Sequence, residues 1–154
     1  MKNKIYFLAL IVFIFAACKN QSKTTVTTKL LSKMNEPSAC YNYSKDSNNV
    51  MMHISIVDNM VKGDLLIEYY QKDKNKGKII GEMKGDTLYA EYTFNSEGLN
   101  SVREVAFLKK GNEFNEGFGD VEEKSGKMIF KNKATIKFEN SMPLTKIKCT
   151  TIEH

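Results

Sequence analysis

Apolar residues recur at every second position through most of this chain from Ala39 onward, a spacing typical of β-strands with one buried face. In the clearest run, one parity is apolar and the other mostly polar: Leu88, Ala90, Tyr92 and Phe94 alternate with Thr87, Tyr89, Glu91 and Thr93. A side-chain period of two leaves little choice of architecture, because successive residues must point to opposite faces of a sheet. The alternation therefore predicts an all-β domain.

Turn-forming pairs interrupt the alternation at intervals of about 8–12 residues. They are Asp58-Asn59, Gly85-Asp86, Gly111-Asn112 and Ser125-Gly126. Such short connections favour one hairpin after another in an up-and-down order. We expect a small antiparallel up-and-down barrel, lipocalin-like, of about eight to ten short strands, with a sandwich as the alternative.

Two cysteines lie near opposite ends of the expected β domain. Cys40 stands at the start of the first convincing strand, and Cys149 lies in the final one, expected over residues 145–150. A disulfide requires Cα atoms about 4.4–6.8 Å apart, so pairing would make the first and last strands near neighbours, as in a closed barrel. We predict this disulfide; two free buried thiols are the alternative.

The start of the chain has the layout of a secretory signal peptide. Lys2 and Lys4 precede an apolar run over residues 5–15, and the small pair Ala16-Ala17 follows before Cys18. A membrane-spanning helix needs about 20 apolar residues, more than this run supplies. The layout predicts a signal helix within a cleaved segment 1–17 and acylation, of the palmitate type, at Cys18, as in a bacterial lipobox.

A polar segment connects this start to the β domain. Residues 18–37 are rich in Thr, Lys and Ser and end at Pro37, so we expect a flexible tether, followed by one β domain over residues 38–154. The chain has 23 basic and 18 acidic side chains, and removal of residues 1–17 leaves a charge of +3. An exported domain with so mild a charge is not expected to bind nucleic acid.

Several short runs between Lys72 and Asn132 carry a family resemblance. They are residues 74–77 (KNKG), 83–88 (MKGDTL), 92–94 (YTF), 96–98 (SEG), 101–105 (SVREV) and 107–111 (FLKKG). With the lipobox, they resemble a group of small cell-envelope lipoproteins of Gram-negative bacteria. The resemblance implies a lipid-anchored protein of the cell envelope. It implies no activity and no assigned site. Lys19 follows the cysteine and no acidic retention signal is present, so we expect the outer membrane, on its periplasmic or surface face.

The candidate ligand-binding residues are Arg103, Glu116, Phe107, Phe118 and Tyr92. Arg103 shares strand parity with Phe107, and a tight turn near Gly111 would bring it within reach of Glu116 or Phe118 on the next strand. If that face points inward, a buried Arg–Glu pair among aromatic rings could anchor the anionic head of a ligand. A purely structural pair is the simpler interpretation.

No motif for catalysis, cofactor binding or metal binding is recognised. His53 has no Cys or carboxylate at ligand spacing, so no metal site is predicted, and the residue is expected to face solvent or a partly covered face. The series Lys72, Lys74, Lys76 and Lys78 flanks a hairpin loop. It is read as a solvated turn, with contact to anionic head groups as the functional alternative.

The sequence thus predicts a non-enzymatic, membrane-anchored binding module for a small apolar or amphipathic ligand. The alternative is a protein that contacts other envelope proteins or inhibits a hydrolase. Small lipoproteins that inhibit lysozyme also combine a disulfide with a β-barrel, but their Ser-Gly-rich loop motif is absent from this chain.

Overall fold

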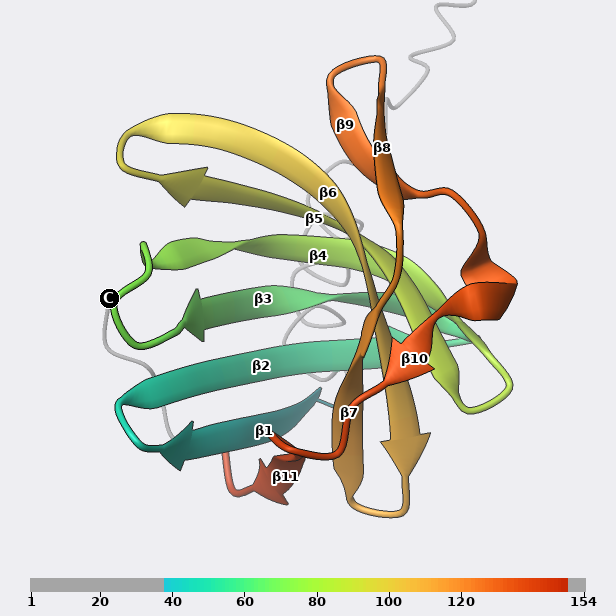
Figure 1. The fold of residues 1–154 in the computed structure, drawn as a ribbon. Coiled ribbons are helices and arrows are strands. Elements are labelled where there is room, and N and C mark those ends of the chain that lie inside the picture. Colours follow the sequence, from blue (N-terminus) through green and yellow to red (C-terminus); the bar gives the residue numbers. More distant parts are fainter. Residues whose placement is uncertain (1–37, 150–154) are drawn as a thin grey trace, which may run out of the picture. The chain divides into compact units, whose positions relative to one another are not determined.

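The computed structural model describes residues 38–149, and this part of the chain is all-β (Figure 1). The predicted signal segment, the acylation site at Cys18 and the tether over residues 18–37 lie outside the described residues. The strands are β1 (Ser38–Lys45), β2 (Asn48–Val57), β3 (Met60–Glu68), β4 (Asn75–Lys84), β5 (Thr87–Ser96), β6 (Leu99–Lys110), β7 (Glu113–Phe118), β8 (Val121–Lys124), β9 (Lys127–Phe130), β10 (Lys137–Phe138) and β11 (Leu144–Ile147). One short 3₁₀ helix, η1 (Lys133–Thr135), precedes β10.

Eight of these strands close into an antiparallel barrel. Strands β1 to β7 pair with one another in chain order, and β11 pairs with both β7 and β1 (Figure 1). The closing ladder places Ile147 opposite Cys40 and Leu144 opposite Phe114. The prediction of a small up-and-down barrel is therefore confirmed, and the alternative of an open sandwich is excluded.

The predicted disulfide spans this closure. Cys40 of β1 is bonded to Cys149, with 5.2 Å between the two Cα atoms and a separation of 109 positions in sequence. Cys149 follows β11, whose last residue is Ile147, rather than lying within the strand as expected. The covalent bond and the β1–β11 ladder thus join the same two parts of the chain.

Two-residue turns set the register of the long hairpins. Asp58 and Asn59, between β2 and β3, both have positive φ, as do Ser125 and Gly126 between β8 and β9. Positive φ at both central positions is the pattern of a type I′ turn, whose twist matches that of paired strands. All four turn pairs expected from the sequence connect consecutive strands.

The barrel interior is filled by one parity of the strand residues. Twelve large side chains are less than 2% exposed: Val50, Met52, Ile54, Val61, Leu65, Ile67, Ile79, Leu88, Tyr92, Phe107, Phe114 and Leu144. The ring of Phe114 meets the rings of Tyr41 and Phe107 edge to face, with centroids 4.9 and 6.5 Å apart. Burial of each such side chain contributes about 1.5–3 kcal/mol to stability, so this face holds the fold together.

Two glycines let neighbouring strands approach closely on the inner wall. A Cβ atom built at Gly63 would lie 2.0 Å from the carbonyl oxygen of His53, and one at Gly81 would lie 2.1 Å from that of Tyr89. Glycine inside a strand commonly marks a bend or a close approach of two backbones. These positions therefore allow strands β2 to β5 to curve into the barrel wall.

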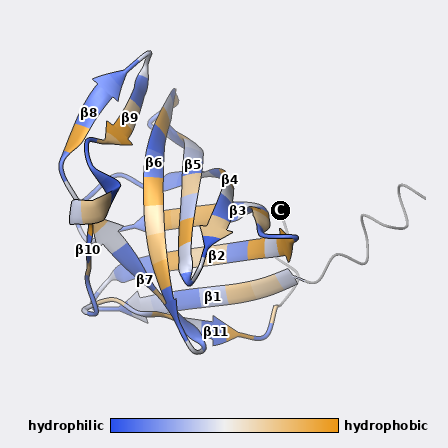
Figure 2. Cartoon of the chain, turned by 90° about the vertical axis from the view of Figure 1, so that its right-hand side faces the viewer, coloured by the Kyte–Doolittle hydropathy of each residue, from blue (hydrophilic) through white to orange (hydrophobic). Residues whose placement is uncertain are grey.

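The β8–β9 hairpin projects beyond the barrel; β8 is mostly hydrophilic, whereas β9 ends in hydrophobic residues (Figure 2). It attaches to β6 through a parallel pairing of Met128 with Arg103. Strand β10 then pairs with the end of β7, where Phe138 lies opposite Gly117. The β8–β9 hairpin, η1 and β10 together cover part of the outer face of β5 and β6.

Candidate functional site

The outer face of β1 to β3 carries two adjacent rows of side chains. The first row runs across the ladder from Ile147 through Cys40 and His53 to Asp64. The second lies two residues along each strand and contains Met51, Leu66 and Lys76. Because side chains two residues apart point to the same face, both rows share the outer surface.

These rows line a pocket of about 630 Å³. Its lining includes Met51, Leu66 and Ile147, together with the disulfide of Cys40 and Cys149. The volume lies within the range of about 300–1,000 Å³ common for small-molecule sites. The inward neighbours of these residues belong to the filled core, so the pocket lies on the outside of the barrel wall.

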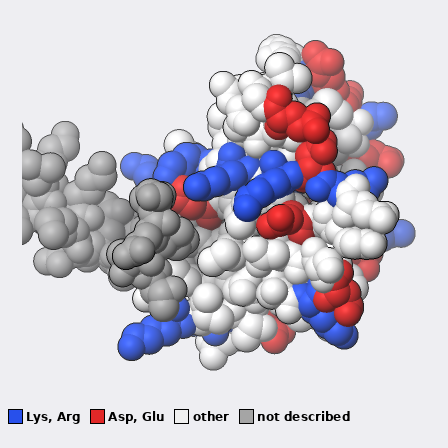
Figure 3. Space-filling model, turned by 90° about the vertical axis from the view of Figure 1, so that its left-hand side faces the viewer, with Lys and Arg blue, Asp and Glu red and all other residues white. Residues whose placement is uncertain are grey.

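Charged groups stand at one side of this pocket. Lys74 pairs with Glu68 at 3.7 Å, and Asp64 pairs with Lys78. Lys76 lines the pocket and forms no ion pair with any residue in the range 38–149. Basic side chains gather in a band across the end of the barrel where the β1–β2, β3–β4 and β5–β6 connections lie (Figure 3). The pocket therefore combines apolar walls with a cation, Lys76, that has no acidic partner in the described part of the chain.

His53, Cys40 and Cys149 come together at this pocket. One imidazole nitrogen and both sulfur atoms all lie within 4.8 Å of one another. As expected, His53 projects from the outer face, because Met52 and Ile54 on either side of it are 1% exposed. No local spacing in the sequence groups these residues, because Cys40 lies 13 positions and Cys149 lies 96 positions from His53. Knowledge of the β1–β2 register, which pairs Cys40 with His53, would have been needed to group them.

A second candidate site is the polar cluster inside the barrel around Glu116. The Tyr69 hydroxyl donates a hydrogen bond to Glu116 at 2.7 Å, and Arg103 lies 5.6 Å from the ring centre of Tyr92. The Nε atom of Arg103 is buried with no hydrogen-bond partner in the described part of the chain. Arg103 and Glu116 both point toward the barrel interior, one of the two directions left open by the sequence, but across residues 38–149 no ion pair joins them within 4 Å.

Burial controls the acid–base behaviour of this cluster. It raises the pKa of the Glu116 carboxyl, although the hydrogen bond from Tyr69 and the positive charge of Arg103 act in the opposite direction. Burial and the neighbouring Glu116 also raise the pKa of the Tyr69 hydroxyl. The Glu116 carboxyl and the Tyr69 hydroxyl therefore both lose their protons at a higher pH than the same groups in water.

The aromatic candidates do not form a ligand pocket with this cluster. Phe107 and Tyr92 are fully buried in the core, and the Tyr92 hydroxyl donates to the backbone oxygen of Asn75 at 2.8 Å. Phe118 is 42% exposed and does not share the inner face with Phe114 and Glu116, because the chain leaves the barrel at this residue to enter the β8–β9 hairpin. Of the five candidates, Arg103 also lines a pocket on the outside of the barrel.

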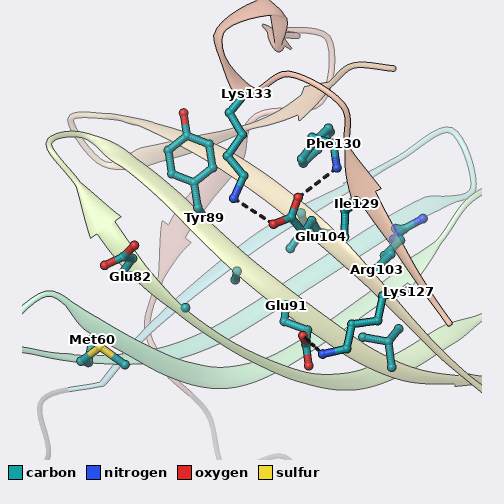
Figure 4. A pocket seen from close by; sticks show the side chains of 14 residues that line it. Met60, Glu82, Tyr89, Glu91, Arg103, Glu104, Lys127, Ile129, Phe130 and Lys133 are labelled. Atoms are coloured by element: carbon teal, nitrogen blue, oxygen red, sulfur yellow. Dashed lines mark hydrogen bonds and ion pairs between the residues drawn. The ribbon is translucent and has the colours of Figure 1, made fainter. Parts of the chain in front are cut away.

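That pocket is a groove of about 320 Å³ between the outer face of β5 and β6 and the β8–β9 hairpin. Figure 4 shows Lys133 and the Phe130 amide pointing toward Glu104; they lie 2.8 and 2.9 Å from its carboxylate oxygens. Burial raises the pKa of Glu104, but these hydrogen bonds and the Lys133 charge outweigh it and hold the pKa below its usual value. Glu91 pairs with Lys127 in the same groove. The carboxylates of Glu91 and Glu104 thus already have basic partners. These ion pairs attach the β8–β9 hairpin and the segment after it to the barrel.

No protein-family model matches this chain, and no significant match is found among curated proteins or solved structures. The resemblance to envelope lipoproteins therefore remains a prediction from the sequence. Within residues 38–149, no helix has the length and apolar character needed to cross a bilayer.

Proposed function

We propose that this protein is an exported, lipid-anchored binding module that holds a small amphipathic anion in the outer pocket over β1 to β3. The observation that carries the proposal is the pocket of about 630 Å³, whose apolar wall ends at Lys76. A ligand with an alkyl chain and a carboxylate or phosphate head matches this arrangement. The alkyl chain would cover Met51 and Leu66, and the head would meet the ammonium group of Lys76.

The location follows from the first part of the sequence. The basic, apolar and small-residue regions that precede Cys18 favour export and acylation. Two or more acyl chains are needed for stable attachment to a membrane, and lipidation at this residue would provide them. The bacterial cell envelope, with an outer-membrane anchor, is therefore the proposed site of action. We propose no catalytic role.

A titration with a fluorescent long-chain fatty acid tests the proposed site. In the full-length protein, Leu66→Asp should weaken binding at least tenfold, because a charge then stands on the apolar wall. Lys76→Glu should weaken binding of the fatty acid but leave binding of the corresponding neutral alcohol nearly unchanged. Tenfold corresponds to about 1.4 kcal/mol of binding free energy.

The chain offers matched controls on the same outer surface. Ile80 is 57% exposed on β4 and lies outside the pocket lining, so Ile80→Asp introduces the same charge without touching the site. Lys62→Glu likewise reverses a charge on β3 away from the pocket. Equal affinities for Leu66→Asp and Ile80→Asp would contradict the proposal.

An exposed sheet edge favours the second candidate, contact with another envelope protein. Strand β8 ends the sheet order, and Phe118, Val121 and Met128 near it are 40–43% exposed. An open edge strand can pair with an extended segment of a partner through its free backbone groups. This surface is separate from the outer pocket, so the two functions do not exclude each other.

A further inference from the structure

We propose that Cys40, His53 and Cys149 form a metal site for zinc or a similar thiophilic ion when the disulfide is reduced. This inference does not depend on the amphipathic ligand. It rests on the placement of three ligand atoms by three separate segments of the closed barrel. Two thiolates and one imidazole are a known donor set for zinc sites that keep an open fourth position.

The barrel fixes two of the three donors before any metal arrives. Cys40 and His53 are direct partners in the β1–β2 ladder, which is paired over the full length of β1. Side chains that oppose each other in an antiparallel pair have Cβ atoms about 4.5–5.5 Å apart. The two donors therefore keep their separation whether or not the disulfide is present.

Cys149 is the donor that has to move. Bond lengths of about 2.3 Å to sulfur and 2.1 Å to nitrogen place tetrahedral donors about 3.5–3.8 Å from one another. All three donor atoms already lie within 4.8 Å of one another, so the required adjustment is small. Cys149 is exposed and follows the last residue of β11, and it is therefore less constrained than the two strand residues.

The surroundings leave room for a fourth ligand. All three residues line the outer pocket of about 630 Å³. Cys40 is 9% exposed and His53 is partly buried, so one side of the site is shielded by protein. The open side faces the pocket, where water or a small anion can complete the coordination. This arrangement differs from a closed structural zinc site, which has four protein ligands.

The redox step that opens the site requires an external dithiol, such as a reduced thioredoxin-like protein. The dithiol gives two electrons and two protons to the Cys40–Cys149 disulfide, which becomes two thiols, and the dithiol becomes a disulfide. Binding of one Zn²⁺ to both sulfurs then releases the two thiol protons. A reducing partner would thus exchange a covalent link between the strands for a metal link.

Zinc binding to the full-length protein, reduced with a phosphine, tests the proposal. We expect one Zn²⁺ per chain for the reduced protein and none for the oxidised protein, measured by competition with a chromophoric chelator. Co²⁺ should give the charge-transfer absorption of thiolate ligands. His53→Ala should lower the zinc affinity at least tenfold, whereas His154→Ala, at the other histidine of the chain, should leave it unchanged.

Loss of the disulfide can also weaken the fold, so the thermal midpoint of the reduced protein is measured with and without zinc. Zinc should raise this midpoint in wild type and less in His53→Ala. The proposal is overturned if reduced wild type binds no zinc, or if His53→Ala binds zinc as tightly as wild type. It is also overturned if zinc leaves the midpoint of the reduced wild type unchanged.

Discussion

A carboxyl group inside the barrel couples the stability of this fold to pH. Burial raises the pKa of Glu116 above that of the same group in an unfolded chain. Below the ordinary Glu pKa of about 4.3, both states hold the proton and the contribution of this group is constant. As pH rises further, the unfolded chain loses its proton first, so the unfolding free energy falls until the native group has also titrated.

Glu116→Gln should therefore flatten this part of the pH profile. The free energy of unfolding of the variant is expected to fall less than that of wild type as pH rises from about 4.5, because glutamine has no proton to lose. The amide oxygen still accepts the hydrogen bond from Tyr69. Urea unfolding at several pH values measures the difference. Glu122→Gln, on exposed strand β8, is the control and should leave the profile unchanged.

Single residues were predicted unevenly from the sequence. Strand parity places Arg103 on the same face as Phe107, but both faces of this strand are apolar in sequence, so parity alone left the inward direction of Arg103 and Glu116 open. Phe118 has the same parity as Glu116 but is the last residue of β7. Strand parity does not predict the direction of a side chain where the strand ends. The gathering of His53 with Cys40 and Cys149 depends on register and closure, and neither is visible in local spacing.

At the level of strands, the positions of the hairpins were the most predictable feature. Pairs such as Asp58-Asn59 and Ser125-Gly126 encode their turns through local backbone preferences, so their sequence alone is informative. The attachment of β9 to β6 was not foreseen. It is held by contacts of Glu104 with Lys133 and the Phe130 amide, more than 25 residues away.

Gly81→Ala should separate two neighbouring strands of the wall. The added Cβ would lie 2.1 Å from the Tyr89 carbonyl oxygen and 2.6 Å from the Ala90 Cβ atom, and backbone cannot yield as a flexible side chain would. We expect a loss of about 1–3 kcal/mol in unfolding free energy, the usual cost of overpacking. Chemical denaturation measures it. Ile80→Val, at the exposed neighbour, should change stability by less than about 0.5 kcal/mol.

For the whole molecule, the predicted pairing of Cys40 with Cys149 correctly indicated a closed barrel. The inference worked because a disulfide is a distance restraint between strands that are far apart in sequence. The eight strands of the barrel fall within the expected eight to ten, but β8 to β10 lie outside the barrel and bring the total among residues 38–149 to eleven. The outer pocket was not predicted. Its walls are outward-facing residues from several strands, and the sequence does not show which strands lie side by side in the closed barrel.

Replacing both cysteines by serine should lower the unfolding free energy by about 2–5 kcal/mol. The disulfide closes a loop of 109 residues, for which the chain-entropy model gives up to about 4.7 kcal/mol. Denaturant titrations of oxidised wild type, reduced wild type and Cys40→Ser/Cys149→Ser measure the loss. The last two should agree. A double variant as stable as oxidised wild type would show that the β1–β11 ladder alone suffices for closure.

The position of β11 also determines the order in which this barrel can be completed. A ribosome or a secretion channel delivers β1 roughly a hundred residues before the strand that covers its free edge. Until β11 is made, the backbone donors and acceptors on the edge of β1 that will face it lack the partners of the finished ladder. Such an edge readily recruits strands from other molecules. Holding nascent chains apart until the last strand arrives is therefore a task for whatever machinery accompanies this protein during its synthesis.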